Sequence, residues 1–245
     1  MGPLHGLPIS FKDQFNFIGV DSTIGYIAFA NKPATEESTL VKLLVECGAV
    51  PYVKTNVPAT LMMGESVNNV WGRTVNPYNR TLTSGGSSGG ESALVSFRGS
   101  FIGVGTDIGG SIRAPASITG LYGLRPTVNL PSFSSLSIAQ ADLLIVQHGR
   151  VTYHKAVNTY VGQEAIRSTA GPLCRSPADI RLFMSALLST QPHLYDPHCL
   201  PIPWRQELEI LPKQLVFAFA PTGDGNTTPT PPLRRAMSVV VSRRC

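Results

Sequence analysis

Two glycine–serine clusters carry the residues of this sequence that are best suited to nucleophilic chemistry. Ser87 follows Gly85-Gly86, and Ser111 follows Gly109-Gly110. Glycine lacks a Cβ, so backbone N–H groups beside these serines can approach a ligand closely. A serine hydroxyl next to free N–H donors provides a nucleophile and an oxyanion site, as acyl transfer requires. Gly/Ser-rich segments are also common in ordinary turns, which is the competing interpretation.

Three features favour a chemical site over a pair of turns. The segment between the clusters is apolar and therefore is not a flexible linker. Asp107 and Arg113 flank the second serine, which places a carboxylate and a guanidinium beside it. Far upstream, Lys12 lies inside an apolar run. A lysine with a depressed pKa can act as a general base toward a serine hydroxyl.

Lys12 can serve as a base only if its pKa falls far below the ordinary value. A lysine with a pKa of about 10.4 has almost no neutral form at pH 7, whereas a base needs a pKa of roughly 7–8. Burial among Ile9, Phe11 and Phe15 would lower the pKa by desolvation. Asp13 would oppose this shift, so we expect its carboxylate to point away. An ordinary exposed lysine is the alternative.

The surrounding pattern predicts an α/β fold, and the resemblance of the motifs below to a known family implies that its core is a mixed β-sheet covered by helices. The expected elements alternate along the chain, as α/β architecture requires. Thr35 is the expected N-cap of the first helix, and Ser176, followed by Pro177, that of a later one. The predicted strands cover residues 7–11, 49–53, 101–104 and 215–220, and the predicted helices cover 36–47, 91–97, the segment from Ser111, the one after Ser176, and 233–241.

Five motifs together resemble the amidase signature family, in particular fungal acetamidase-like and general amidases. They are LHGLPISFKD around Lys12, KTNVPA from Lys54, WGRTVNPYN from Trp71, GGSSGGE from Gly85 and GTDIGGSIR from Gly105. The match covers roughly residues 2–127 and resumes near 148–240. The set is much more specific than any one motif. The resemblance implies one partial amidase signature domain over residues 1–245, incomplete at both ends.

The resemblance also implies a site and a reaction. Lys12, Ser87 and Ser111 correspond to a Ser–Ser–Lys triad in which Ser111 attacks the amide carbonyl and Ser87 relays its proton to Lys12. The peptide bond before Ser87 is expected to be cis. Substrate hydrolysis through an acyl-enzyme would need no cofactor and no metal. The residues expected to hold the oxyanion or the substrate are Ile108, Gly109, Gly110 and Met63.

Residues 128–147 have no counterpart in the family pattern, although LYGLRPT before them and HGRVTYHK after them both fit it. Val128-Asn129 can be encoded by a donor-like GTAAAT, and Val146-Gln147 by an acceptor-like GTACAG. We favour an intron retained in frame over a surface-loop insertion, which a fold tolerates at modest cost. A transcript carrying only the longer form would exclude the intron.

Composition narrows the classes of partner. The chain of 245 residues is 42% hydrophobic and 14% charged, which is typical of a globular protein. Its net charge of +5 comes from scattered basic residues without interleaved aromatics, so we predict no nucleic-acid partner. No membrane-length apolar run and no signal peptide is present, and four sparse cysteines suit a reducing compartment, so we predict a cytoplasmic protein. His193 and His198 near Asp196 lack a third metal ligand at suitable spacing.

The predicted function is hydrolysis of a small or aliphatic carboxamide to a carboxylate and ammonia or an amine. A small-molecule amide is the expected partner, and a homodimer is left open. Two alternatives remain. One is a catalytically incompetent fragment that carries the triad without the rest of the fold. The other is an amidotransferase A-type subunit, which shares the signature and works with a tRNA-bound partner.

Overall fold

The computed structural model describes residues 1–128, 149–163, 166–210, 214, 216, 218 and 225–243. The chain divides into two compact units, Met1–Trp204 and Arg205–Cys245. The second unit contains a 3-10 turn, η5 (Gln206–Glu209), and one helix, α5 (Pro231–Ser242). The site residues predicted from the sequence all belong to the first unit.

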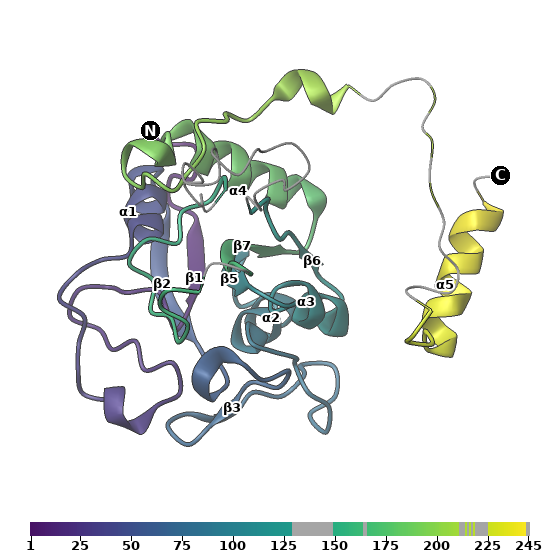
Figure 1. Cartoon of the computed structure of the whole chain (residues 1–245), viewed down its shortest axis with the longest axis horizontal. Coiled ribbons are helices and arrows are strands. Elements are labelled where there is room, and N and C mark those ends of the chain that lie inside the picture. The colour runs from purple at the N-terminus through teal and green to yellow at the C-terminus, as the bar shows by residue number, and fades with distance from the viewer. Residues whose placement is uncertain are drawn as a thin grey trace, which may run out of the picture. The chain divides into compact units, whose positions relative to one another are not determined.

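A five-stranded mixed sheet forms the centre of the first unit (Figure 1). Its strand order is β2-β1-β5-β7-β6, and β1 pairs in parallel with both β2 and β5, whereas β7 is antiparallel to β5 and β6. A two-stranded sheet joins β3 to β4. The strands are β1 (Pro8–Lys12), β2 (Val50–Thr55), β3 (Val67–Asn68), β4 (Gly72–Arg73), β5 (Ile102–Asp107), β6 (Tyr122–Gly123) and β7 (Thr169–Cys174).

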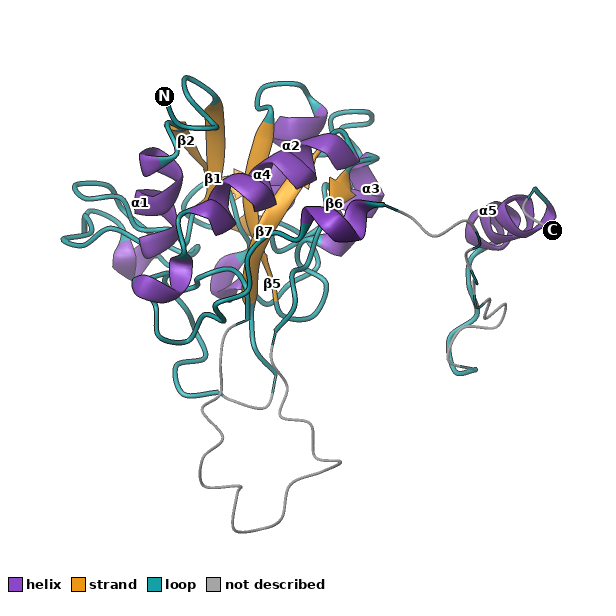
Figure 2. Cartoon of the chain, turned by 90° about the horizontal axis from the view of Figure 1, so that it is seen from above, coloured by secondary structure: helices purple, strands orange, loops and turns teal. Residues whose placement is uncertain are grey.

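Helices cover both faces of this sheet (Figure 2). Those of the first unit are α1 (Thr39–Glu46), α2 (Gly89–Ser96), α3 (Arg113–Thr119) and α4 (Pro177–Ser189), with 3-10 turns at η1 (Ile27–Phe29), η2 (Ala59–Leu61) and η4 (Pro192–Leu194). The mixed sheet covered by helices is the predicted fold class, and that prediction is confirmed.

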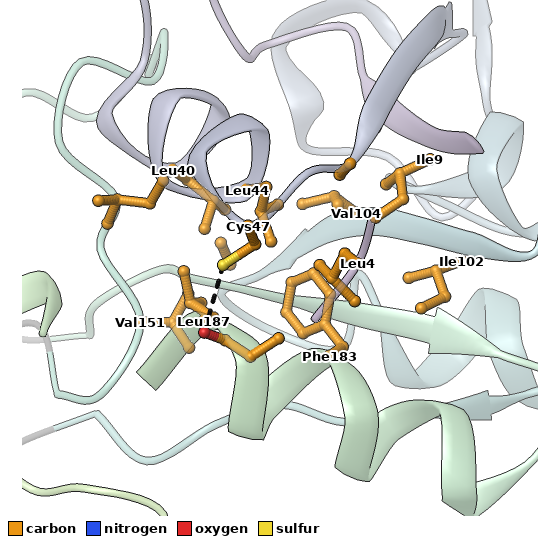
Figure 3. Packing of buried hydrophobic residues seen from close by; sticks show 14 of the residues in the cluster. Leu4, Ile9, Leu40, Leu44, Cys47, Ile102, Val104, Val151, Phe183 and Leu187 are labelled. Carbon is orange, nitrogen blue, oxygen red and sulfur yellow. Dashed lines mark hydrogen bonds between the residues drawn. The ribbon is translucent and has the colours of Figure 1, made fainter. Parts of the chain in front are cut away.

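Alternating side chains on β1 separate the core from the site. Ile9 and Phe11 are fully buried in the main apolar cluster, which α1 and α4 complete (Figure 3). Successive side chains of a strand point to opposite faces, so Ser10 and Lys12 face the α2 side instead. Ser10 accordingly donates a hydrogen bond to a carboxylate of α2. The core that stabilises β1 therefore also fixes the direction of the Lys12 side chain.

Glycines on β5 let α2 lie close to the sheet at this point. A Cβ atom on Gly103 would stand 2.3 Å from Glu91 Oε2, and one on Gly105 would stand 2.9 Å from Ser88 Oγ. A Cβ atom at either position would force these side chains to move, so glycine at both positions permits the close packing. The close packing brings the start of α2, where Ser87 lies, against the end of β1.

The structure corrects the start of one predicted helix and confirms the start of another. The helix expected over 36–47 with Thr35 as its N-cap begins only at Thr39, with Ser38 as the N-cap. Backbone hydrogen bonds from Ala34 to Val20 and from Ser38 to Asn16 hold the preceding segment in a non-helical conformation. The prediction for α4 is confirmed, because Ser176 Oγ accepts a hydrogen bond of 3.2 Å from the Asp179 N–H and Pro177 opens the helix.

Two predicted segments fall outside the described residues. The strand expected over 215–220 lies there apart from residues 216 and 218, which are not in a strand. The segment 128–147 lies there apart from Val128. The described ends of that segment touch, since a Cβ atom placed on Gly149 would lie 1.8 Å from the Thr127 carbonyl oxygen. The residues on the two sides of the segment, Thr127 and Gly149, are therefore neighbours in the described fold.

The described helices are all too short or too polar to cross a bilayer. Within the described residues, no three His, Cys, Asp or Glu side chains are grouped so that they could hold a metal ion. Asp196, near the two histidines considered above, instead accepts hydrogen bonds from Thr152 Oγ1 at 2.6 Å and from the His198 N–H at 3.0 Å. These bonds close the loop that follows α4.

Candidate active site

Lys12 ends β1 with its side chain completely buried, which excludes the exposed lysine considered from the sequence. Its Nζ lies 2.7 Å from Ser87 Oγ and 2.7 Å from Thr106 Oγ1. The parallel pairing of Phe11 with Val104 sets β1 beside β5, so that the end of β5 lies next to the amine. Two hydroxyl groups are therefore the hydrogen-bonding partners of one buried amine.

Burial lowers the pKa of Lys12 from 10.5 to about 7. The desolvated amine disfavours its charged form, and this effect outweighs the opposing charges of Asp107, Glu91 and Asp13. The Asp13 carboxylate is directed elsewhere, since its Oδ2 accepts a hydrogen bond of 2.6 Å from the Ile24 N–H. About half of the Lys12 side chains are consequently neutral at pH 7, which a general base needs.

Glu91 is a second buried ionisable group close to Lys12. Burial raises its pKa to about 8, although hydrogen bonds from Ser10 and Thr55 favour the ionised form. Ser10 Oγ lies 2.5 Å from Oε2, and Thr55 Oγ1 lies 2.6 Å from Oε1. A carboxyl group with this pKa is mostly protonated at pH 7. Its ionised form opposes the lowering of the Lys12 pKa, as Asp107 and Asp13 do.

The two glycine–serine clusters meet at the end of β5. The Gly86–Ser87 peptide bond is cis, as the resemblance implied. The Ser88 N–H donates a hydrogen bond of 3.1 Å to the Ser111 carbonyl, which joins the two clusters. Ser87 and Ser111 line one small cavity of about 20 Å³. In the described part of the chain, no hydrogen bond joins their two hydroxyl groups.

Asp107 organises the loop that carries Ser111. Its buried carboxylate accepts hydrogen bonds from the N–H groups of Gly110 at 2.8 Å and Ile112 at 3.1 Å, and from the Arg113 side chain at 3.0 Å. Burial raises the pKa of this carboxyl group. The hydrogen bonds from the Arg113 side chain and from these N–H groups lower the pKa by more than burial raises it, so that it lies below its ordinary value. Asp107 is thus ionised at neutral pH and fixes the loop conformation.

The predicted oxyanion donors differ in their availability. The Gly110 N–H is engaged by Asp107, so it is not free for a ligand. The N–H groups of Ile108, Gly109 and Ser111 donate no hydrogen bond to another described residue. These three remain as donors that could stabilise a negative oxygen near the Ser111 hydroxyl.

Met63 does not line the cavity beside Ser111, contrary to the expectation from the motif. Its side chain is 52% exposed, while its carbonyl oxygen packs against Gly86. Leu61 and Met62 line the cavity instead, together with Ile108 and Tyr153. The non-glycine backbone at residues 60 and 61 has positive φ values of 68° and 64°, which turns the chain there. Counting from the motif could not anticipate that turn.

Two larger hollows of about 550 and 530 Å³ lie elsewhere on the first unit. The larger is lined by β2, α2 and the segment 74–80, and the other by Asp13, Lys54 and Trp71 with their neighbours. Lys12, Ser87 and Ser111 line neither of them. Size alone therefore does not identify the site, whereas the buried amine beside two hydroxyls does.

Comparison with known proteins agrees with this geometry. A family model described as Amidase matches residues 1–243. This chain belongs to the amidase family. Membership confirms the resemblance noted from the five motifs and the fold class predicted with it.

The similar amidases include fungal proteins and one solved structure. A putative amidase kk1C of Curvularia clavata is 63% identical over 229 residues, which cover 94% of this chain and 39% of that protein. An acetamidase of Emericella nidulans is 45% identical over 247 residues, covering 99% of this chain and 41% of its own length. A fatty acid amide hydrolase structure superposes with a TM-score of 0.81 at 38% identity, covering 99% of this chain and 39% of that one. The chain therefore spans about 40% of the length of these relatives.

Sequence reasoning missed two residues of the site. Thr106 contacts the Lys12 amine directly, and Gln14 contacts Thr106 in turn. Thr106 lies within a matched motif, and the parallel pairing of residues 7–11 with 101–104 would have placed it beside Lys12. Gln14 carries no such signal, because a glutamine next to a charged pair is common on protein surfaces.

Proposed function

We propose that this amidase-family chain supplies the catalytic centre for hydrolysis of a small or aliphatic carboxamide to a carboxylate and ammonia or an amine. The observation that carries the proposal is the buried Lys12, whose pKa of about 7 and contact of 2.7 Å with Ser87 suit a general base acting through a hydroxyl.

In the proposed reaction, Ser111 Oγ attacks the amide carbonyl carbon. Its proton passes to Ser87 Oγ, and the Ser87 proton passes to the neutral Lys12 amine. The negative charge that develops on the carbonyl oxygen is held by the free N–H groups of Ile108, Gly109 and Ser111. When the C–N bond breaks, the proton returns through Ser87 to the leaving nitrogen. Water then attacks the acyl-enzyme by the same relay and releases the carboxylate.

The size and lining of the cavity support a small, uncharged acyl group. A volume of about 20 Å³ accommodates roughly one water-sized group. Leu61, Met62 and Ile108 supply apolar walls to this cavity, and its other lining residues carry hydroxyl or amide groups, so the lining favours an uncharged acyl group over a charged one. The name of the 45% identical acetamidase agrees with a short acyl group.

Covalent labelling tests the nucleophile without requiring turnover. The 245-residue chain is treated with a fluorophosphonate, and the mass increase of the intact protein is followed with time. We expect one adduct on Ser111, lost in Ser111→Ala and slowed by at least about a hundredfold in Lys12→Ala, as expected for loss of a general base. Ser117→Ala and Lys32→Met are the matched controls at exposed positions, and both should leave the labelling rate unchanged. An adduct that persists in Ser111→Ala would refute the role of that serine.

A second candidate is an incompetent chain that folds but does not turn over an amide. The Ser87 and Ser111 hydroxyls share no hydrogen bond in the described structure. This favours the incompetent chain, because the contact that would carry the proton from Ser111 to Ser87 is missing. Ammonia release from acetamide distinguishes the two. Labelling of Ser111 with ammonia release supports the hydrolase, whereas labelling without ammonia release supports the incompetent chain.

A further inference from the structure

We infer that Gln14 is a positioning residue that directs the lone pair of the Lys12 amine toward Ser87. This inference rests on the proposed function, since it assigns a role within the same proton relay. Gln14 is fully buried two residues after Lys12, and its side chain does not contact the amine. It acts through Thr106, whose hydroxyl lies between them.

A backbone carbonyl fixes the orientation of the Gln14 amide. Gln14 Nε2 donates a hydrogen bond of 2.9 Å to the Val157 carbonyl oxygen, which can only accept. The nitrogen of the amide must therefore face Val157, and Oε1 must face the opposite way, toward Thr106. Nε2 also donates to the Tyr153 hydroxyl, a contact that is compatible with this orientation, and the same hydroxyl is hydrogen-bonded to Thr106. The Val157 N–H in turn donates to the Gln14 carbonyl at 2.9 Å, so both segments are tied together.

The orientation of Gln14 decides what Thr106 can do. Thr106 Oγ1 lies 2.6 Å from Gln14 Oε1, an oxygen that can only accept, so the Thr106 hydroxyl proton is committed to Gln14. Thr106 Oγ1 can then only accept from Lys12 Nζ, 2.7 Å away. A neutral amine has two N–H groups and one lone pair. With one N–H bound to Thr106, the remaining hydroxyl that can donate to the lone pair is that of Ser87.

Without Gln14 the same contacts allow the wrong arrangement. If the acceptor at Oε1 is removed, the Thr106 hydroxyl can rotate and donate its proton to the Lys12 lone pair. Thr106 would then compete with Ser87 for the base. The hydrogen-bond chain from Val157 through Gln14 and Thr106 to Lys12 therefore has a single direction in the native protein, and this direction leaves the base available.

The orienting role predicts an unusual order of labelling rates among the variants. Gln14→Met removes the acceptor without touching the amine, and we expect it to slow fluorophosphonate labelling of Ser111 roughly tenfold, the effect of one competing hydrogen bond. Thr106→Val removes a direct contact of the amine but also removes the competing donor, and we expect a smaller loss. In the double variant, Thr106→Val should restore the rate toward that of Thr106→Val alone. If Gln14 and Thr106 only stabilise packing, the losses add and the double variant is slowest.

The pH profile supplies a second readout that packing would not change. In Gln14→Met the Thr106 hydroxyl stabilises the neutral amine, so the rise of labelling rate with pH should move to lower pH while the plateau falls. Urea unfolding of each variant confirms that it is folded, and Gln14→Leu replaces Gln14→Met if methionine prevents folding. The inference is overturned if the rate losses of the two single variants add in the double variant and the pH profile of Gln14→Met matches that of the native chain.

The outcomes separate this inference from the proposed function. If the native chain is not labelled at Ser111, or is labelled equally in Lys12→Ala, the proposed function fails and the inference fails with it. If labelling is specific and depends on Lys12, but Gln14→Met reacts at the native rate, only the inference fails. Recovery in the double variant supports both.

Discussion

Replacing Lys12 by methionine should stabilise the first unit while it abolishes the chemistry. Methionine fills a similar volume without a titratable group, so the variant removes the cost of keeping an amine buried. The native pKa is about 7, compared with 10.5 for an exposed lysine, and each pKa unit corresponds to about 1.36 kcal/mol. At pH 7 the buried amine therefore costs about 4 kcal/mol relative to an exposed one.

Two lost hydrogen bonds reduce this gain. Lys12 Nζ contacts Ser87 and Thr106, and each contact contributes about 1 kcal/mol. We therefore expect Lys12→Met to raise the free energy of unfolding by about 2 kcal/mol at pH 7. Methionine in place of lysine is expected to leave the apolar packing of β1 unchanged, because Ile9 and Phe11 point to the opposite face.

The gain should disappear as the pH rises. The unfolded state binds more protons at Lys12 than the folded state between pH 7 and 10.5, so native stability increases with pH across that range. At pH 9 the cost of the buried amine falls to about 2 kcal/mol, and the net effect of Lys12→Met falls to about zero. Glu91 adds to this trend, because loss of the amine keeps it protonated to higher pH.

Urea unfolding followed by tryptophan fluorescence measures this difference. Trp71 and Trp204 are the two tryptophans of the sequence, and both lie in the first unit, so the signal reports that unit. Measurements at pH 7 and pH 9 on native protein and Lys12→Met give the pH dependence of the difference, and Lys32→Met controls for loss of a lysine at an exposed position. A stability difference that does not change between pH 7 and 9 would refute the depressed pKa, and with it the neutral base.

Three further predictions concern the reaction, the loop before α3 and the unmatched segment. The rate of Ser111 labelling should rise with pH below about 7 and level off above it, because the base acts when deprotonated; a rise centred above pH 9 would contradict this. Asp107→Asn removes a buried carboxylate charge that pairs with the half-exposed Arg113 and with Arg125, and it should lower the free energy of unfolding by about 3 kcal/mol, whereas Glu65→Gln, in an exposed pair, should change it by less than about 1 kcal/mol in the same urea titration. Deleting Val128–Gln147 should raise the free energy of unfolding by about 1–2 kcal/mol, since its flanks already touch, and a collapse of the urea midpoint would show that the segment is part of the fold.

The strands and helices around the site were predictable because their signals are local. The apolar run before Lys12 predicts β1, and the cap formed by Ser176 and Pro177 predicts the start of α4. The start of α1 was predicted too early, because the backbone of residues 34–38 is held by Val20 and Asn16 across a loop. A local cap signal at Thr35 cannot report such a tertiary contact.

Side-chain surroundings were harder to predict than positions. The sequence predicts that Lys12 is either a buried base or an exposed residue, and only the packing of α2 against Gly103 and Gly105 decides between them. The Gly110 N–H was predicted to bind an oxyanion, but in the structure it donates its hydrogen bond to Asp107. Such assignments depend on hydrogen-bond partners that are distant in the sequence, or on rotamers, neither of which a motif encodes.

The bond between Gln14 and Val157 has a consequence for synthesis of the protein. Lys12, Ser87 and Ser111 all leave the ribosome before Val157, which is added after a further 46 residues beyond Ser111. A nascent chain can therefore bring amine and hydroxyls together while the carbonyl acceptor that orients the amide is still missing. Until that late segment docks beside β1, the nucleophile would react more slowly, by roughly the tenfold expected for Gln14→Met, so the order of translation itself reduces premature acylation of the growing chain.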